Sequence, residues 1–305
     1  MRYHQALLVS CEIPWTEKEE LMEDLFREQV RRTLASGFNN LYIFGTAGEG
    51  YAVDTPRFRR IVHVFFEETS ADGVFPQVGI IGLSTANILE RLSYAYEVGF
   101  RTFQLSMPSW GALNDNEVLK FFTDVCGAYP DCRFLHYNLP RTKLLLTGDD
   151  YRHLAGAVPN LVATKNTATN HASTIDLVEG SAGIQHFLGE AMFPFGTLCG
   201  ECSLLSSYGP VFPSKSKQLF EYAVTGQVEK LFRFHKEYLA VVRDVAAPTL
   251  KHVRIDGAYD KLWVRLGGLP MPLRLLSPYE SLPEETYDEC RRILHEKHPD
   301  WVEAD

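Results

Sequence analysis

The regular alternation of short apolar strands with helical segments is the feature that most constrains the fold of this chain. Strands that alternate with helices along a sequence form parallel sheets, and eight strand–helix units within residues 1–225 predict a (β/α)8 barrel. The eight predicted strands are Gln5–Ser10, Asn40–Phe44, Phe75–Ile81, Thr102–Ser106, Arg133–Tyr137, Leu161–Thr164, Ile184–Leu188 and Ser203–Ser207.

Several helices carry recognisable start signals. Asn114 with Glu117, and Thr147 with Asp150, have the spacing of a capping box, in which two side chains satisfy free backbone N–H groups reciprocally. The first helix is predicted over Glu17–Ser36, where apolar residues recur at helical spacing. These signals separate the strands in the way that a barrel requires.

Residues 226–305 continue the helical pattern beyond the eighth unit. The predicted helices are Gln227–Val245, Gly257–Leu266 and Pro283–His295. No low-complexity linker precedes them, so we expect a barrel over residues 1–225 and a C-terminal helical extension over 226–305 packed on it. A doubly wound sheet is the alternative, but no Gly-x-Gly-x-x-Gly fingerprint follows the first strand.

Composition and charge limit the kinds of binding partner that we expect for this protein. The chain has 305 residues, 45% of them hydrophobic, and a net charge of −9 in mixed sign. Nucleic-acid-binding proteins are usually basic, and no apolar run here is long enough to cross a membrane, so we expect neither partner. The first residues lack a signal-peptide pattern. Cys199-x-x-Cys202 has no second cysteine pair to complete a zinc site, which favours reduced thiols in a cytoplasmic protein.

Lys165 stands at the end of the predicted strand Leu161–Thr164, directly before polar, turn-forming residues. Burial of an ammonium group is costly and lowers its pKa. A lysine with a lowered pKa is a nucleophile that forms a Schiff base with a carbonyl compound. The alternative is a solvated or ion-paired lysine just past the strand.

Candidate site residues gather where the other predicted strands end, which is where barrel enzymes carry their reactive groups. These residues are Thr46, Ala47, Gly48, Trp110, Tyr137, Arg141, Gly189 and Glu190. A glycine-rich turn offers backbone N–H groups to a carboxylate, a tyrosine can relay protons, and an arginine can bind a second carboxylate. Taken one at a time, each has a purely structural alternative.

Four segments together resemble the dihydrodipicolinate synthase / N-acetylneuraminate lyase family. They are GTAGEG at 45–50, YNLPRT at 137–142, VATKNT at 162–167 and LGEAMF at 188–193. The resemblance implies a class I aldolase, synthase or dehydratase that acts on pyruvate or a related 2-oxo acid. It implies no cofactor and no metal, because the reaction proceeds through a covalent imine at Lys165. It also implies a homo-oligomer, either a dimer or a tetramer.

The resemblance also implies roles for individual residues. Lys165 matches the Schiff-base lysine, Tyr137 the tyrosine that moves protons, and Thr46 the hydroxyl residue that hydrogen-bonds this tyrosine. Leu204 falls near the apolar residue that packs over the lysine. Arg141 resembles the arginine that binds the second substrate's carboxylate in the synthase branch, with one residue deleted before it.

Other positions depart from the family pattern. Gly48 keeps the turn of the carboxylate-binding loop, but Ala47 replaces a second hydroxyl residue and removes one hydrogen bond to the substrate carboxylate. Trp110 stands where the synthase branch has a tyrosine lent by a neighbouring subunit, and an indole cannot shuttle a proton. These departures predict an altered substrate rather than the lysine-biosynthetic reaction.

Two other functions stay open from the sequence. His136, His186 and Glu190 could serve a metal-dependent aldolase, although they do not form a spaced ligand motif. A non-catalytic barrel that binds a small acid would keep Gly48 and form no imine at Lys165.

Overall fold

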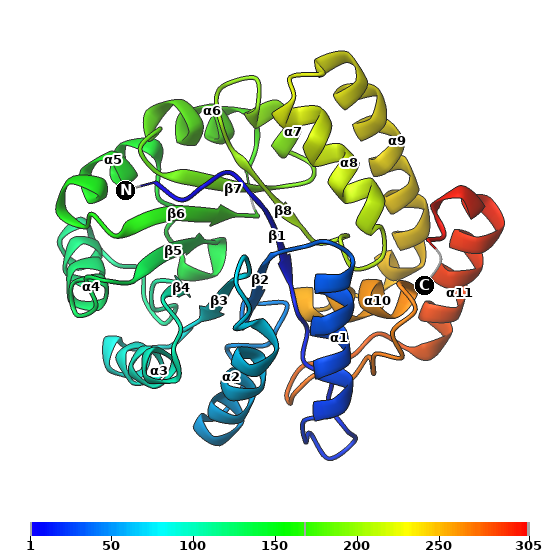
Figure 1. Cartoon of the computed structure of the whole chain (residues 1–305), viewed down its shortest axis with the longest axis horizontal. Coiled ribbons are helices and arrows are strands. Elements are labelled where there is room, and N and C mark those ends of the chain that lie inside the picture. Colours follow the sequence, from blue (N-terminus) through cyan, green and yellow to red (C-terminus); the bar gives the residue numbers. More distant parts are fainter. Residues whose placement is uncertain (1, 168, 304–305) are drawn as a thin grey trace.

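The computed structural model describes residues 2–167 and 169–303, and within them eight parallel strands close into a barrel (Figure 1). Each strand pairs with the next, and β8 pairs with β1. The predicted (β/α)8 barrel is confirmed. The strands are β1 Leu7–Ser10, β2 Asn40–Ile43, β3 Phe75–Gly79, β4 Thr102–Leu105, β5 Arg133–Asn138, β6 Leu161–Asn166, β7 Gln185–Gly189 and β8 Ser203–Ser206.

Helices follow the strands and form the outer layer. They are α1 Glu23–Ala35, α2 Thr55–Thr69, α3 Thr85–Val98, α4 Asp115–Gly127, α5 Gly148–Ala157, α6 His171–Gly180, α7 Phe193–Gly196 and α8 Pro213–Val224. Both predicted capping boxes are present, at Asn114 on α4 and Thr147 on α5.

The first helix begins six residues later than predicted, at Glu23. The preceding segment folds into a turn, in which Glu20 accepts a hydrogen bond from the backbone of Thr16 and Glu19 has a positive φ of 60°. A short bridge between Trp15 and Leu21 closes this turn. The apolar spacing around Leu21 therefore belongs to the turn and not to a first helical repeat.

Side chains of the strands face two separate apolar layers. Residues such as Leu8, Tyr42 and Leu205 fill the interior of the barrel. Their neighbours, such as Val9, Ile43 and Leu204, pack outward against the helices. This alternation follows from the two-residue period of a strand and decides which residues reach the site.

The C-terminal helices are α9 Val228–Ala246, α10 Asp256–Leu266 and α11 Glu284–Lys297. Short 3-10 turns cover Pro140–Thr142, Ala247–Lys251 and Pro299–Trp301. In Figure 1, α11 lies beside α9 at the edge of the molecule, whereas α10 lies between α1 and α9. These helices share a second apolar cluster with the segment before α8. In the described part of the chain, no helix is both long and apolar enough to span a membrane.

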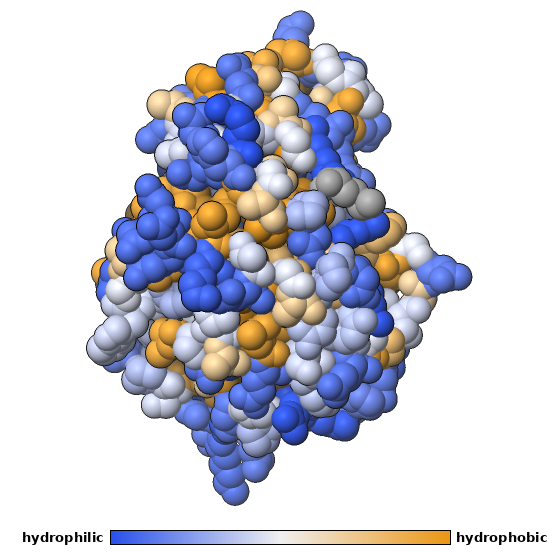
Figure 2. Space-filling model, turned by 90° about the vertical axis from the view of Figure 1, so that its left-hand side faces the viewer, coloured by the Kyte–Doolittle hydropathy of each residue, from blue (hydrophilic) through white to orange (hydrophobic). Residues whose placement is uncertain are grey.

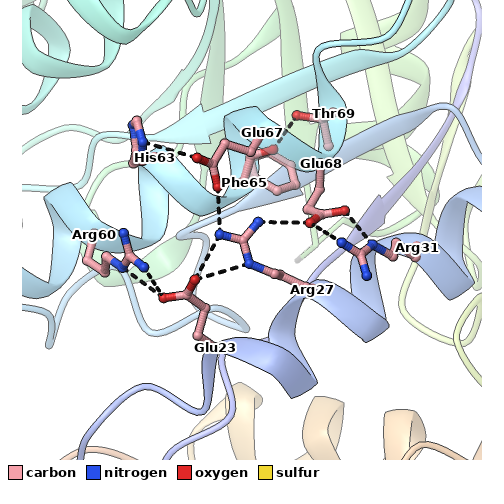
Figure 3. Close-up of polar contacts among 9 residues, drawn as sticks. All are labelled: Glu23, Arg27, Arg31, Arg60, His63, Phe65, Glu67, Glu68 and Thr69. Atoms are coloured by element: carbon pink, nitrogen blue, oxygen red, sulfur yellow. Dashed lines mark hydrogen bonds and ion pairs between the residues drawn. The ribbon is translucent and has the colours of Figure 1, made fainter.

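A network of charged side chains joins α1 to α2 (Figure 3). Arg27 is its centre and donates hydrogen bonds to Glu23 (2.8 Å), Glu67 (2.6 Å) and Glu68 (2.9 Å). Arg31 also binds Glu68, at 2.7 Å. The arginine hydrogen bonds hold the pKa values of the three glutamates below their ordinary range. Burial opposes this for all three and is the largest single influence on Glu68. The network fixes the packing of the two helices on the outside of the barrel.

Candidate active site

Lys165 lies inside β6 rather than beyond it, because the strand extends to Asn166. Its register partner on β5 is Tyr137. Only 2% of the Lys165 surface is exposed, at the floor of a cavity of about 530 Å³. The cavity is lined by Tyr42, Ala47, Tyr137, Pro140, Arg141, Lys165, Thr167, Leu205, Ser207, Asp256 and Asp260.

Two tyrosine rings surround the amine of Lys165. Its Nζ donates a hydrogen bond to the hydroxyl of Tyr42 at 2.9 Å. The same atom lies 4.1 Å from the ring centroid of Tyr42 and 4.0 Å from that of Tyr137. Gly45 leaves the necessary space, because a Cβ there would lie 3.0 Å from Nζ and 2.8 Å from the Tyr42 ring.

Burial lowers the pKa of Lys165 to about 7, although the nearby carboxylates of Asp260, Asp256 and Glu12 oppose this shift. A large fraction of the amine is therefore unprotonated near neutral pH. An unprotonated amine has the lone pair that attack on a carbonyl requires. The fully solvated lysine that the sequence left open does not describe this side chain.

Tyr137 and Thr46 lie together at the opening of the barrel. Thr46 Oγ1 hydrogen-bonds the Tyr137 hydroxyl at 3.3 Å. Burial raises the pKa of Tyr137, and the hydrogen bond from Thr46 opposes this rise. The phenol thus keeps its proton at neutral pH and stands next to Lys165, where it can give a proton and take one back.

Close backbone packing and buried hydrogen bonds hold the turn after β2 in place. A Cβ at Gly48 would lie 2.7 Å from the backbone nitrogen of Phe44, so this position accepts only glycine without a shift of the backbone. Glu49 has a positive φ of 55° and is fully buried. It accepts hydrogen bonds from Lys261 (2.6 Å) and Trp15 (2.8 Å). Ala47, directly before Gly48, lines the cavity.

Two carboxylates of α10 form the far wall of the cavity. Asp256 binds Arg141 through both oxygens, at 3.0 and 3.1 Å. Burial and the neighbouring Glu12 raise the pKa of Asp260 well above its ordinary value. Arg141 lines the cavity, as predicted. Its guanidinium is already paired with the carboxylate of Asp256.

The prediction for Leu204 is wrong by one residue. Leu204 faces the helices in the outer core, and its neighbour Leu205 lines the cavity. The register of β8 explains the difference, because Leu205 pairs with the inward-facing Leu8 of β1.

Gly189 and Glu190 also lie outside the cavity lining. Glu190 is buried, and its Oε1 accepts hydrogen bonds from Ser206 (3.1 Å) and from the backbone N–H groups of Ser207 (2.7 Å) and Tyr208 (3.1 Å). The carboxylate thus shapes the loop after β8 and does not face a substrate, which corrects its predicted role in binding.

Trp110 lies in the loop after β4 and is 85% exposed. Its side chain does not line the cavity of this chain. Its place at a subunit interface, where the synthase branch has the relay tyrosine lent by a neighbouring subunit, stays a prediction.

Sequence reasoning missed Tyr42, Asp256 and Asp260. Tyr42 is an inward-facing residue near the end of a predicted strand, which was a usable signal. Asp256 and Asp260 are spaced four residues apart, so they lie on one face of α10. The sequence alone did not predict that α10 contributes to the cavity at the barrel opening.

His136 and His186 belong to the structural core. His136 Nδ1 pairs with the hydroxyl of Tyr151 at 2.7 Å, and His186 contacts Thr164 and Ser181. Burial lowers the pKa of His136 to about 3 and that of His186 to about 4. Among the described residues, no three His, Cys, Asp or Glu side chains form a group that could hold a metal ion.

These features define a barrel protein with a buried lysine on the floor of a partly acidic cavity. The chain belongs to the dihydrodipicolinate synthetase family, whose model matches residues 4–297.

Curated relatives match most of the chain at low identity. The 4-hydroxy-tetrahydrodipicolinate synthase of Methanopyrus kandleri is 25% identical over 296 residues, which cover 92% of each chain. That of Ralstonia nicotianae is 24% identical and covers 88% of this chain and 92% of its own.

Solved structures share the fold. YagE, a prophage protein of the dihydrodipicolinic acid synthase family from E. coli K12 solved in complex with pyruvate, has a TM-score of 0.85 at 18% identity, covering 95% of this chain and 97% of its own. CdNal from Clostridium difficile, solved in complex with mannosamine, has a TM-score of 0.84 at 15% identity, covering 98% and 100%.

Proposed function

We propose that this protein is a lyase that forms a Schiff base between Lys165 and pyruvate or a related 2-oxo acid. The observation that carries the proposal is the buried amine of Lys165 at the floor of a cavity, with a pKa lowered to about 7. Family membership supports the same class of reaction. The proposed chemistry needs no group beyond the imine.

In the proposed reaction, the lone pair of Lys165 Nζ attacks the 2-oxo carbon, and a carbinolamine forms. Tyr137, oriented by Thr46, donates a proton to the leaving hydroxyl, and water departs as the iminium appears. The iminium withdraws electrons from C3, so that a C–C bond at C3 can form or break. In a sugar acid, loss of a proton from C3 instead gives an enamine that expels the C4 hydroxyl as water. Tyr137 then recovers its proton from the reacting carbon or from water.

The backbone of the turn at Ala47 and Gly48 would hold the C1 carboxylate of the substrate. Ala47 provides no hydroxyl for this task, and a hydrogen bond to a charged group contributes about 1.5–3 kcal/mol. Arg141 is bound by Asp256, so a second carboxylate on the substrate would have to compete with it. We therefore propose a distal part without a carboxylate, and hence a substrate other than that of the synthase relatives.

Trapping with sodium borohydride tests this proposal. The folded protein is incubated with pyruvate, or with longer 2-oxo sugar acids, and the intact mass is measured after reduction. We expect an adduct of the size of one substrate, absent from Lys165→Ala and retained by Lys120→Ala, which removes an exposed lysine on α4. A folded protein that forms no adduct with any 2-oxo acid would instead be a non-catalytic binding barrel.

We also propose that the chain forms a homo-oligomer. Figure 2 shows the side of the molecule that carries α4 and α5, where hydrophobic residues lie between hydrophilic ones. Leu119 and Leu145 are exposed there and line a groove of about 490 Å³. Light scattering of the purified protein measures the mass, and a monomer at micromolar concentration would contradict this proposal.

A reducing, cytoplasmic environment is proposed from the cysteines. All six lie within the described residues and are free thiols. Cys199 and Cys202 donate weak hydrogen bonds to backbone carbonyls of Phe195 and Phe193 and do not pair with each other. Titration of thiols in the unfolded protein under non-reducing conditions would count six.

A further inference from the structure

An unpaired carboxyl group on α10 lines the same cavity as Lys165 and takes no part in the proposed formation of the imine. This group belongs to Asp260, which is partly buried. Among the described residues, no hydrogen bond or ion pair joins it to the rest of the protein. Asp256, one turn earlier, differs because both of its oxygens bind Arg141. A carboxyl group withdrawn from water needs a hydrogen-bond partner, and a ligand in the cavity can supply one.

The position of Asp260 is fixed because α10 packs closely on the turn after β2. A Cβ at Gly257 would lie 3.0 Å from the carbonyl oxygen of Ala47. One helical turn later, Lys261 forms its buried ion pair with Glu49 of the same turn, at 2.6 Å. Residues four apart lie on one face of a helix. This face therefore holds the turn, and the adjacent face presents Asp260 to the cavity.

The surroundings keep the carboxyl group of Asp260 protonated. Among the described residues, no cationic side chain pairs with it, and an unpaired charge withdrawn from water is costly. Burial, followed by the charges of Glu12 and Asp256, raises the pKa of Asp260 well above its ordinary value, and the charge of Lys165 opposes this rise. A protonated carboxyl group carries an O–H donor. Asp260 can therefore give a proton to a substrate.

We propose that Asp260 is the acid that protonates the C4 hydroxyl of a 4-hydroxy-2-oxo acid, so that this protein removes water from its substrate. The assignment rests on the proposed function of Lys165 and narrows it to dehydration. Hydroxide is a poor leaving group, and an acid placed at the departing oxygen lowers the barrier to its loss.

The proton balance of this step closes. Tyr137 takes the C3 proton, which gives the enamine at Lys165. The nitrogen lone pair then re-forms the C2=N bond, the C2=C3 electron pair forms a C3=C4 bond, and the C4–O bond breaks. Asp260 gives its proton to the departing oxygen, which leaves as water. Hydrolysis of the conjugated iminium by water frees Lys165 and releases one proton, which restores Asp260.

The rest of the lining suits a hydroxylated substrate. The cavity of about 530 Å³ leaves room for carbon atoms beyond those of pyruvate. Thr167 and Ser207 contribute to its wall, and their side chains carry hydroxyl groups that both donate and accept hydrogen bonds. Arg141, the cation that would select a distal carboxylate, is already paired with Asp256.

The mass of the borohydride-trapped adduct tests the role of Asp260. The full chain and Asp260→Asn are each incubated at pH 8 with pyruvate and with both enantiomers of 4,5-dihydroxy-2-oxopentanoate. We expect the unchanged protein to give an adduct one water lighter than the whole substrate. Asp260→Asn should give the adduct of the whole substrate and dehydrate it at least about a hundredfold more slowly, the size of effect typical of a general acid. Its pyruvate adduct should still form, because that step uses Lys165 and Tyr137.

A leaving group that needs no proton separates a chemical role of Asp260 from a structural one. Chloride departs without protonation, so Asp260→Asn should eliminate it from 4-chloro-2-oxopentanoate within about threefold of the rate of the unchanged protein. Equal slowing for hydroxyl and chloride would indicate a role in folding or positioning and overturn the proposal. Asp288→Asn changes an exposed aspartate of α11 and is the matched control, which should dehydrate its substrate at the unchanged rate.

The remaining outcomes separate this proposal from the proposed function. A pyruvate-sized adduct from 4,5-dihydroxy-2-oxopentanoate would show cleavage between C3 and C4 and overturn the role of Asp260 in dehydration. Dehydration by Asp260→Asn at the unchanged rate would overturn it as well. A pyruvate adduct in the unchanged protein, without loss of water from either enantiomer, would refute dehydration and leave the Schiff base intact. A folded protein that forms no adduct with any 2-oxo acid would refute the proposed function itself.

Discussion

Replacing Lys261 by methionine should destabilise the protein strongly, because it leaves a buried carboxylate without its charge partner. Lys261 on α10 and Glu49 in the turn after β2 are both fully buried and 2.6 Å apart. Removal of one partner of a buried ion pair costs about 3–5 kcal/mol. Glu49 keeps two donors, Trp15 Nε1 at 2.8 Å and the backbone N–H of Leu276 at 2.6 Å. We therefore expect a loss near the lower limit, about 3 kcal/mol.

Urea denaturation followed by circular dichroism measures this loss as a lower midpoint at an unchanged slope. The double variant Glu49→Gln/Lys261→Met removes both charges and should recover most of the stability. A single variant within about 1 kcal/mol of the unchanged protein would refute the reasoning. So would a double variant as unstable as Lys261→Met, because the loss would then come from packing.

Three further predictions follow from local contacts. Gly45→Ala places a methyl group about 3.0 Å from the amine of Lys165, and we expect at least a tenfold slower borohydride trapping in a folded protein; an unchanged rate would contradict this. Arg27→Met should cost about 1 kcal/mol at pH 7 in urea denaturation. The pKa values of the glutamates paired with Arg27 are lowered in the folded protein. The stability difference between the two proteins is therefore present above the unfolded carboxyl pKa of about 4.3 and is lost as the pH falls below it. The difference should also shrink in 1 M salt, whereas a difference that persists in acid would argue for lost packing. Asp256→Asn should release Arg141 and lower the KM for a dicarboxylic 2-oxo acid relative to pyruvate; an equal change for both would contradict the pairing.

The sequence was sufficient for the architecture because a barrel repeats one simple pattern. Each strand–helix unit carries its own apolar period and its own end signals, and both predicted capping boxes formed. The position of Lys165 at the end of a strand was visible in the same way. Helix α1 was misplaced because the apolar spacing near Leu21 also suits a turn.

The details of the site were harder to predict because they depend on register and on distant segments. A shift of one residue separates Leu204, which faces the helices, from Leu205, which faces the cavity. Asp256 and Asp260 reach the cavity from a helix that follows the barrel in sequence, and local patterns do not specify where such a helix docks. Glu190 was predicted to bind substrate, but its carboxylate accepts hydrogen bonds from the loop after β8.

The central claim is that one particular lysine carries the chemistry. The most direct measurement is peptide mapping of the protein after reaction with pyruvate and borohydride at pH 8, with the modified fraction determined for every lysine. We expect one adduct per chain, on Lys165, with Lys261 and the exposed lysines unmodified. An adduct located on another lysine, or spread over several, would contradict it.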